Sequence, residues 1–239
     1  MGKLAAMRLG ALVTAPMIIG GIPFGLIFGS LAISQGLEPW VPLALSLFVF
    51  AGSAQFVALG LLATGTPAWI IVFTTLVINL RHILYAADLL KYVRHLPLGW
   101  RVILAFGLTD EAYAGVKPYY ANGKFDLATG HWAYFGSIVA MYLMWNTTTV
   151  IGMLAGELIP GMSEWGLEFA MVATFIGIIT PYLRNLPYWG AFVVAGSAAL
   201  LLADLPNNLG MLLAALLGVA AGVGIEQMQD KLKLQRGAN

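Results

Sequence analysis

The chain has 239 residues, of which 60% are hydrophobic and only 10% are charged, and its mean hydropathy is +0.85. Soluble domains carry about 25% charged residues, so this composition excludes an ordinary soluble globular protein and indicates membrane-spanning helices. The net charge of +1 gives no reason to expect a nucleic acid partner, and the absence of cysteine excludes disulfides and thiolate metal ligands.

Apolar segments follow one another along the chain, and the first continues too far to be the apolar region of a signal peptide. We expect the segments at residues 9–34, 41–62, 67–90, 102–116, 132–154, 166–183, 189–203 and 208–225. No polar linker separates domains. Residues 1–239 are therefore predicted to form one transmembrane transporter domain with a basic cytoplasmic tail at about 227–239.

Two of these segments are not expected to be simple spans. The first contains Gly20-Gly21-Ile22-Pro23-Phe24-Gly25, and glycines followed by a proline favour a helix break. The fourth, 102–116, covers only about 22 Å as a helix, short of the roughly 30 Å hydrocarbon core. We therefore predict an all-α polytopic membrane bundle of seven or eight apolar segments with broken or re-entrant helices.

The orientation of the chain follows from its basic residues, because lysine and arginine in short loops stay cytoplasmic. This rule places the C-terminal tail, Lys117 and Lys124 inside. Three full crossings before Lys91 would then place Lys3 and Arg8 outside. Either the N-terminus is external, giving seven crossings, or the first segment doubles back at its break, and the sequence leaves both alternatives open.

The third apolar segment ends in a group of polar side chains, Asn79 to Asp88. On a helix, Arg81, Tyr85 and Asp88 share one face, and Asn79 and His82 lie on a neighbouring stripe. Ionisable groups in a membrane helix usually face a bundle interior or a water-filled path. Alternatively, the helix reaches the interface near Tyr85, so that Arg81 snorkels and Asp88 is solvated. Arg81 and Asp88 are about 10 Å apart along the helix, so Arg81 needs a partner from another segment.

The fourth segment supplies that partner. Asp110 and Glu111 point about 100° apart on a helix, so one is expected to pair with Arg81 while the other faces solvent or a proton path. The alternative is a solvated helix end. Uncharged candidates in other segments, for which ordinary helix packing is the alternative, are Gly25, Gly52, Ser53, Gln55 and Asn146.

Several catalytic patterns do not occur in the sequence. It has no G-x-x-x-x-G-K-[ST] phosphate loop, no H-E-x-x-H zinc pair and no G-x-S-x-G elbow. The three histidines are dispersed without the spacing of metal ligands. We therefore expect no enzymatic activity and no cofactor, and an intramembrane enzyme is the less favoured alternative.

Four motifs occur in order: Ile22-Pro-Phe-Gly25, Phe50-Ala-Gly-Ser-Ala-Gln-Phe56, Asn79-Leu-Arg-His82 followed by Tyr85, and Leu108-Thr-Asp-Glu111. Together they resemble the AzlC-type branched-chain amino acid permease family, the large subunit of azaleucine-resistance exporters. The resemblance implies a multi-pass protein of the bacterial inner membrane that exports leucine, isoleucine, valine and sometimes methionine. It also implies a small AzlD-type membrane subunit as partner.

We predict a secondary exporter of branched-chain or similar apolar amino acids, coupled to protons. The substrate ammonium would meet Asp110 or Glu111. Its carboxylate would meet Arg81 or free backbone amides near Gly52 or Gly25. A passive channel or an assembly subunit for another small zwitterionic solute is the alternative. The predicted substrate-binding or coupling residues are Gly25, Gly52, Ser53, Gln55, Asn79, Arg81, His82, Tyr85, Asp110, Glu111 and Asn146.

Overall fold

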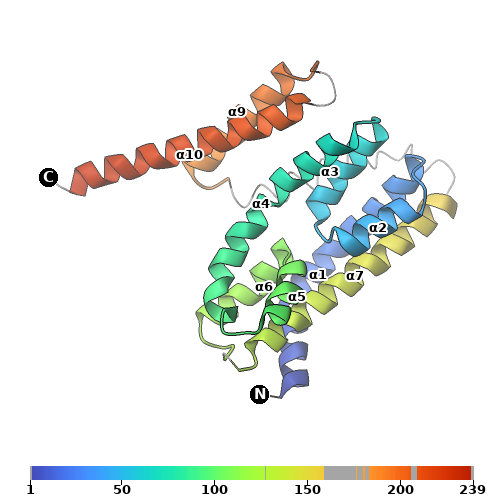
Figure 1. Cartoon of the computed structure of the whole chain (residues 1–239), viewed down its shortest axis with the longest axis vertical. Coiled ribbons are helices and arrows are strands. Elements are labelled where there is room, and N and C mark those ends of the chain that lie inside the picture. Colours follow the sequence, from blue (N-terminus) through green and yellow to red (C-terminus); the bar gives the residue numbers. More distant parts are fainter. Residues whose placement is uncertain are drawn as a thin grey trace. The chain divides into compact units, whose positions relative to one another are not determined.

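The structure, a computed structural model, describes residues 2–126, 128–158, 176, 180, 183–205 and 209–237. No strand occurs in these ranges, so the predicted all-α class is confirmed (Figure 1). The helices are α1 (Lys3–Ser34), α2 (Trp40–Phe48), α3 (Gly52–Ala63), α4 (Ala68–Val93), α5 (Leu98–Phe106), α6 (Asp110–Ala121), α7 (Gly130–Leu158), α9 (Leu186–Leu201) and α10 (Leu209–Gly237).

Four of the described helices are long and apolar enough to cross a membrane, namely α1, α4, α7 and the Leu209–Lys233 part of α10. The predicted total of seven or eight apolar segments is not confirmed by this number. The predicted segment 166–183 lies almost wholly outside the described residues.

The chain divides into two compact units, Met1–Gly60 with Thr75–Met171 and Leu61–Thr74 with Val172–Asn239. In the second unit α9 and α10 pack antiparallel, since Gly190 lies against Ile225 and Gly210 against Leu202. The predicted basic tail begins inside α10, which is helical as far as Gly237. The prediction of one transporter domain stays a prediction.

In the first unit α1 and α7 form a close parallel pair. Gly10 lies against the Ala133 backbone and Gly29 against the Thr149 backbone, so residue numbers rise together along both helices. Small residues allow membrane helices to approach closely in this way. Two buried hydrogen bonds add to the contact, Thr14 Oγ1 with Ser137 Oγ (2.6 Å) and Ser30 Oγ to the Gly152 carbonyl (2.7 Å).

The helix break predicted at Gly20–Gly25 is wrong, because α1 runs without interruption through Pro23. A proline in a membrane helix frees one carbonyl group, for which neighbouring helices and local adjustments compensate. Gly21 and Gly25 serve the contact with α7 instead, whereas a side chain at Gly20 would have no neighbour within 4 Å. A side chain at Gly25 would overlap the Thr148 side chain.

The breaks occur in two other predicted segments. Segment 41–62 is interrupted at residues 49–51, between α2 and α3. Segment 102–116, which we predicted as one short helix, is interrupted at residues 107–109, between α5 and α6. Each pair of short helices is a hairpin packed on the α1–α7 pair, and we refer to the two ends of α7 as the Gly130 end and the Leu158 end.

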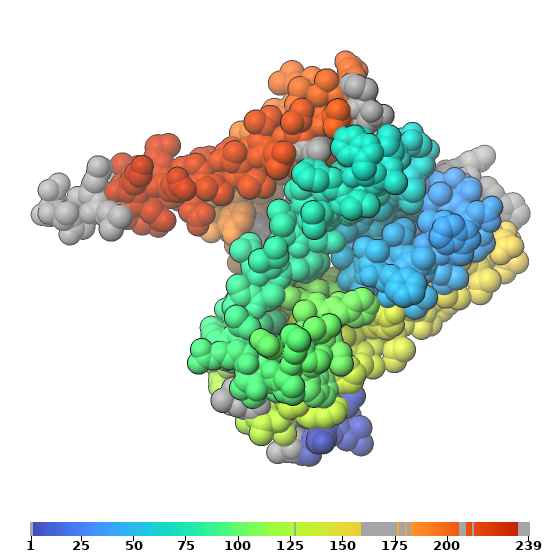
Figure 2. All heavy atoms as spheres, viewed as in Figure 1, coloured from blue at the N-terminus to red at the C-terminus, as the bar shows by residue number. Residues whose placement is uncertain are grey.

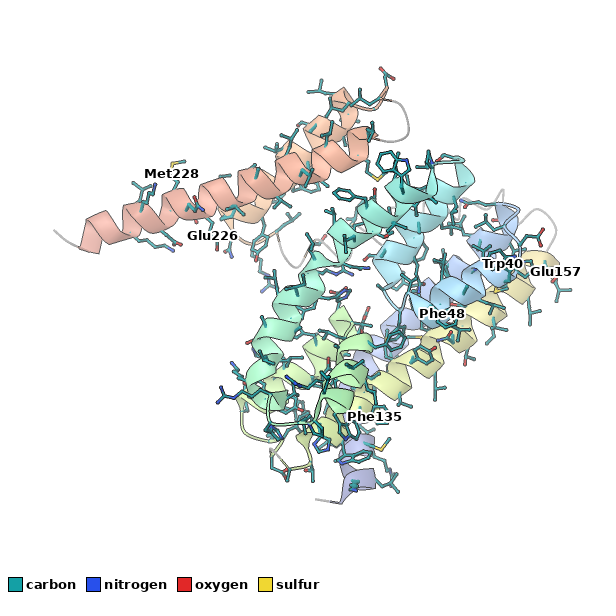
Figure 3. The ribbon with its side chains drawn as sticks, in the orientation of Figure 1. Trp40, Phe48, Phe135, Glu157, Glu226 and Met228 are labelled. Atoms are coloured by element: carbon teal, nitrogen blue, oxygen red, sulfur yellow. The ribbon has the colours of Figure 1, made fainter. Side chains whose placement is uncertain are left out.

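The α2–α3 hairpin approaches from the Leu158 end. Figure 3 shows Trp40, at the start of α2, towards the same end of the unit as Glu157, whereas Phe48 lies nearer the middle. The Gln55 side chain of α3 donates a hydrogen bond to the Leu45 carbonyl of α2 (3.0 Å), so α3 folds back along α2.

The α5–α6 hairpin approaches from the opposite, Gly130 end. The Trp100 ring lies 5.0 Å from the His131 ring, and Phe106, at the end of α5, lies 6.2 Å from Tyr142 further along α7. α6 then returns, because Tyr120 lies against the first residue of α7. In the space-filling view the green atoms of α5 lie over the yellow-green start of α7 (Figure 2). The fourth predicted segment therefore consists of two short helices in place of one, and its re-entrant path stays a prediction.

One buried side chain, Gln55, holds the first break. It is 0% exposed, and its Nε2 donates to the Leu45 and Val49 carbonyls at 3.0 and 3.3 Å. Its Oε1 accepts from Trp145 Nε1 at 2.9 Å. The Gln55 amide therefore donates to the Val49 carbonyl at the break and adds a second bond to the Leu45 carbonyl, which also accepts from the Val49 backbone amide at 2.9 Å.

Replacing Gln55 by methionine should destabilise the protein by about 2–4 kcal/mol, because buried polar groups would lose their partner. Thermal unfolding in detergent measures the change. The matched control is Gln35→Met, since Gln35 Oε1 is buried with no partner among the described residues. Equal losses of stability in the two variants would contradict the assignment of Gln55 to the break.

Candidate functional site

Arg81, within α4, connects the tips of the two hairpins. Its Nη2 forms an ion pair with Asp110 Oδ2 at 2.8 Å and donates a hydrogen bond to Ser53 Oγ at 2.6 Å. Asp110 is the first residue of α6, and Ser53 is the second residue of α3. Tyr85, one turn further along α4, donates to Asp110 Oδ1 at 2.8 Å. Arg81 thus has the expected carboxylate partner from the fourth predicted segment.

The two helix starts at this site differ in charge. α6 begins with an N-cap, Thr109, whose side chain accepts from the Ala112 amide at 3.2 Å. Asp110 and Glu111 follow in its first turn, where carboxylates offset the partial positive charge of a helix N-terminus. The first turn of α3, which starts at Gly52, has no acidic residue. The α3 side of Arg81 therefore favours an anionic group, and the α6 side favours a cation.

Three polar atoms on α4 beside the ion pair keep unused hydrogen-bonding capacity. Arg81 Nε, Asn79 Oδ1 and His82 Nε2 are buried and have no hydrogen-bond partner among the described residues. Buried polar groups are nearly always paired with protein, water or a ligand. The arrangement can therefore accept and donate further hydrogen bonds next to a cation and a carboxylate. The described residues contain no group of three or more side chains that could hold a metal ion.

The structure brings most of the predicted site residues together around Arg81. Glu111 lies beside Asp110 in the first turn of α6 and is half-buried, with a hydrogen bond from Thr109. His82 lies next to Tyr85, with 6.0 Å between their ring centroids. The residues of this cluster are Ser53, Asn79, Arg81, His82, Tyr85, Asp110 and Glu111.

The uncharged candidates have other contacts. Gly25 packs on α7, and Gly52 lies against the Trp145 ring. The Gln55 amide is occupied by the helix break described above. Asn146 Nδ2 donates to the Tyr142 carbonyl of its own helix at 2.9 Å. For Gln55 and Asn146 these bonds are to the protein itself, so a role in substrate binding stays a prediction for both.

A second ionic group, absent from the predicted set, follows the first towards the Gly130 end. Asp88 forms an ion pair with Lys117 and accepts a hydrogen bond from the Tyr113 hydroxyl at 2.8 Å. The alternative in which Asp88 is simply solvated is therefore wrong. Lys117 was missed because the predicted segment ended at Val116, whereas Tyr113 lies inside that segment and was missed because only its charged residues were considered. The signal that finds them is the spacing of three and then four residues from Asp110, which places all three on one helix face.

The AzlC protein family is matched over residues 16–159, the part of the chain that contains both hairpins and both ionic groups. The chain belongs to the AzlC family. This membership confirms the resemblance inferred from the four motifs. The matched range ends one residue after the last residue of α7.

Three similar proteins can be aligned with most of this chain. An uncharacterized membrane protein of Archaeoglobus fulgidus is 32% identical over 91% of this chain and 94% of its own length. The branched-chain amino acid transport protein AzlC of Bacillus subtilis is 29% identical over 80% of this chain and 74% of its own. The inner membrane protein YgaZ of Escherichia coli is 30% identical over 69% and 68%. No solved structure matches the chain.

The membrane location is confirmed by these relatives together with the long apolar helices. The relatives are named as membrane or transport proteins. α1 and α4 also expose large apolar side chains, including Leu12, Ile19, Ile83 and Leu84, to their surroundings. Exposed apolar surface of this extent marks contact with lipid or with another membrane protein. The protein is a multi-pass membrane protein, as the composition predicted.

Proposed function

We propose that the protein is a secondary exporter of branched-chain or similarly apolar amino acids, coupled to the proton gradient and acting with a small AzlD-type subunit. Family membership and the name of the B. subtilis relative support the transport of branched-chain amino acids. The observation that carries the proposal is the Arg81–Asp110 ion pair between two helix N-termini. An amino acid zwitterion carries the complementary pair of charges.

The zwitterion exchanges with the ion pair. Its carboxylate binds the Arg81 guanidinium and the start of α3, and its ammonium binds Asp110. The pair is partly exposed, with side chains of Arg81 and Asp110 at 26% and 28%, and pairs of this kind are worth about 0–1 kcal/mol. Opening the pair therefore costs little, and the bound substrate leaves neither charge without a partner.

Proton coupling in this proposal belongs to Glu111 or His82. Asp110 is already bound by Arg81 and Tyr85, and its charge is needed to hold the substrate ammonium. Glu111 and His82 lie next to the ion pair and are free of it. Protonation of either changes the net charge beside Arg81, which links the proton gradient to the substrate affinity of the site.

Transport by the purified chain tests this function. The chain, with and without the small subunit, is reconstituted into proteoliposomes loaded with radiolabelled L-leucine. We expect concentrative movement that follows an imposed pH gradient and stops when a protonophore is added. Equilibration of leucine regardless of the gradient would instead identify a passive channel. No leucine counterflow in either preparation would refute amino acid transport.

A further inference from the structure

The facing surfaces of α4 and α6 carry the same chemistry twice, in reversed order. α4 presents an arginine, a tyrosine four residues on and an aspartate three residues on. α6 presents an aspartate, a tyrosine three residues on and a lysine four residues on. The helices run in the same direction, so three cross-helix pairs form: Arg81 with Asp110, Tyr85 with Tyr113, and Asp88 with Lys117.

The second ionic group repeats the composition of the first. Asp88 and Lys117 form an ion pair with side-chain exposures of 30% and 25%, close to those of Arg81 and Asp110. A tyrosine hydroxyl bonds each carboxylate at 2.8 Å, from Tyr85 in the first group and from Tyr113 in the second. Both groups therefore offer a cation, a carboxylate and a phenol at partly accessible positions, and the second also has Lys91, whose Nζ lies 3.4 Å from Asp88 Oδ1.

The two tyrosines separate the ionic groups. Their rings are stacked with centroids 4.5 Å apart and an interplanar angle of 13°. Arg81 and Asp88 are two turns apart on α4, about 10 Å. The ammonium and carboxylate of an amino acid share one carbon, so a single molecule cannot bridge both groups. A molecule moving between the groups passes the stacked rings and binds one ionic group at a time.

A purely structural role explains this arrangement poorly. Partly exposed ion pairs contribute about 0–1 kcal/mol to stability, whereas ionisable residues in membrane helices are costly and mark substrate or ion paths. Leu89 and Val116, next to the charged positions, are 2% and 0% exposed and belong to one buried apolar cluster, which contributes packing that does not depend on the charges.

We propose that Asp88, Tyr113 and Lys117 form a second binding site for the transported amino acid, between the Arg81–Asp110 site and the Gly130 end. This inference rests on the proposed function. The polarity of the second site is inverted: the substrate carboxylate meets Lys117 on α6, and its ammonium meets Asp88 on α4. The amino acid therefore turns between the two sites as it passes the tyrosine pair.

Equilibrium binding of L-[3H]leucine to the purified full chain in detergent tests the second site. We expect the wild-type protein to bind two leucines per chain at saturation. The double variant Asp88→Asn/Lys117→Gln removes both members of the cross-helix pair and leaves only Lys91, whose side chain is 58% exposed, without its ion-pair partner. This variant should bind one leucine, with the affinity of the remaining site unchanged within twofold. The matched control is Asp230→Asn/Lys233→Gln on α10, an exposed pair at 63% and 77%, which should still bind two.

The outcomes separate the second site from its alternatives. Binding of one leucine per wild-type chain, or of two leucines per chain of the double variant, overturns the second site. If the wild-type protein binds one leucine and the double variant is defective in transport, the Asp88–Lys117 pair is a gate. No binding to the wild-type protein contradicts the proposed function itself. Tyr113→Phe, which keeps the ring stack, is a second variant that tests the site even if the double variant misfolds. It should weaken the second site roughly tenfold through the lost hydroxyl, and unchanged binding overturns the proposal.

Discussion

Replacing Arg81 by alanine should reduce leucine efflux by about 100-fold or more, because hydrogen bonds to a charged group, such as those from Arg81 to the substrate carboxylate, are worth about 1.5–3 kcal/mol each. The substrate carboxylate would lose its partner, and Asp110 would lose its ion pair. Efflux is measured from preloaded proteoliposomes at equal protein content. Arg101→Ala is the matched control, because Arg101 is an exposed arginine on α5, and it should retain efflux close to wild type.

Two further substitutions sharpen this test. Asp110→Asn should cause a comparable loss, since the substrate ammonium would meet an uncharged amide. Arg81→Lys should cause a smaller loss, because lysine keeps the charge but lacks the planar group that reaches Asp110 and Ser53 together. Normal efflux in both Arg81→Ala and Asp110→Asn, with normal abundance in the membrane, would remove these residues from the site.

The second large effect is expected at Gly29. Alanine there should destabilise the protein by about 1–3 kcal/mol, because the added methyl group overlaps the Thr149 backbone and the helices must separate. Gly20→Ala on the same helix is the control, since nothing lies within 4 Å of a side chain at that position. Its effect should range from neutral to a stabilisation of up to about 1 kcal/mol from the higher helix propensity of alanine.

The unfolding midpoints of both variants in one detergent measure this difference. A lower midpoint for Gly29→Ala than for Gly20→Ala is the expected order. The same midpoint in the two variants would show that α1 and α7 are not held at the close separation that Gly10, Gly29 and Gly152 permit.

Sequence reasoning succeeded where one segment carries its own signal. The apolar runs at 67–90 and 132–154 correspond to α4 and α7, because continuous hydrophobicity decides membrane helices. The need of Arg81 for a carboxylate from another segment followed from the cost of an unpaired charge in an apolar surrounding. The cost of an unpaired charge does not depend on the fold. The sequence alone therefore identified Asp110 and Glu111 as candidate partners.

The helix breaks show where sequence reasoning stops. Gly20 to Gly25 has the composition of a break, but Gly21 and Gly25 pack closely against α7 and the helix continues. Residues 49–51 contain neither glycine nor proline, and their break depends on hydrogen bonds from Gln55, which only the folded hairpin brings into place. At Thr109 a local signal did exist, since a threonine followed by two acids is typical of a helix start. We read those acids as lying inside a helix.

The same breaks predict an orientation for the N-terminus. The chain reverses direction in the α2–α3 hairpin and not within α1. Both α1 and α7 therefore begin at the Gly130 end and run parallel. Lys3 and Arg8 then lie at the end to which Lys91 and Lys117 belong. All four satisfy the preference of basic residues for the cytoplasmic side. Neither alternative drawn from the sequence included this path.

The parallel pairing of α1 with α7 has a consequence for synthesis. Thr14 and Ser137, which bond each other, are 123 residues apart in the chain. Ribosomes add roughly 5–20 residues per second, so α1 waits roughly 6–25 s before α7 reaches the bilayer. During that time the glycine surface of α1 is open to any other small-residue helix in the membrane. The α1–α7 contact can thus form only after α7, the last described helix of this unit, has been made, and until then α2 and α6 are the parts of the unit available to pack on α1.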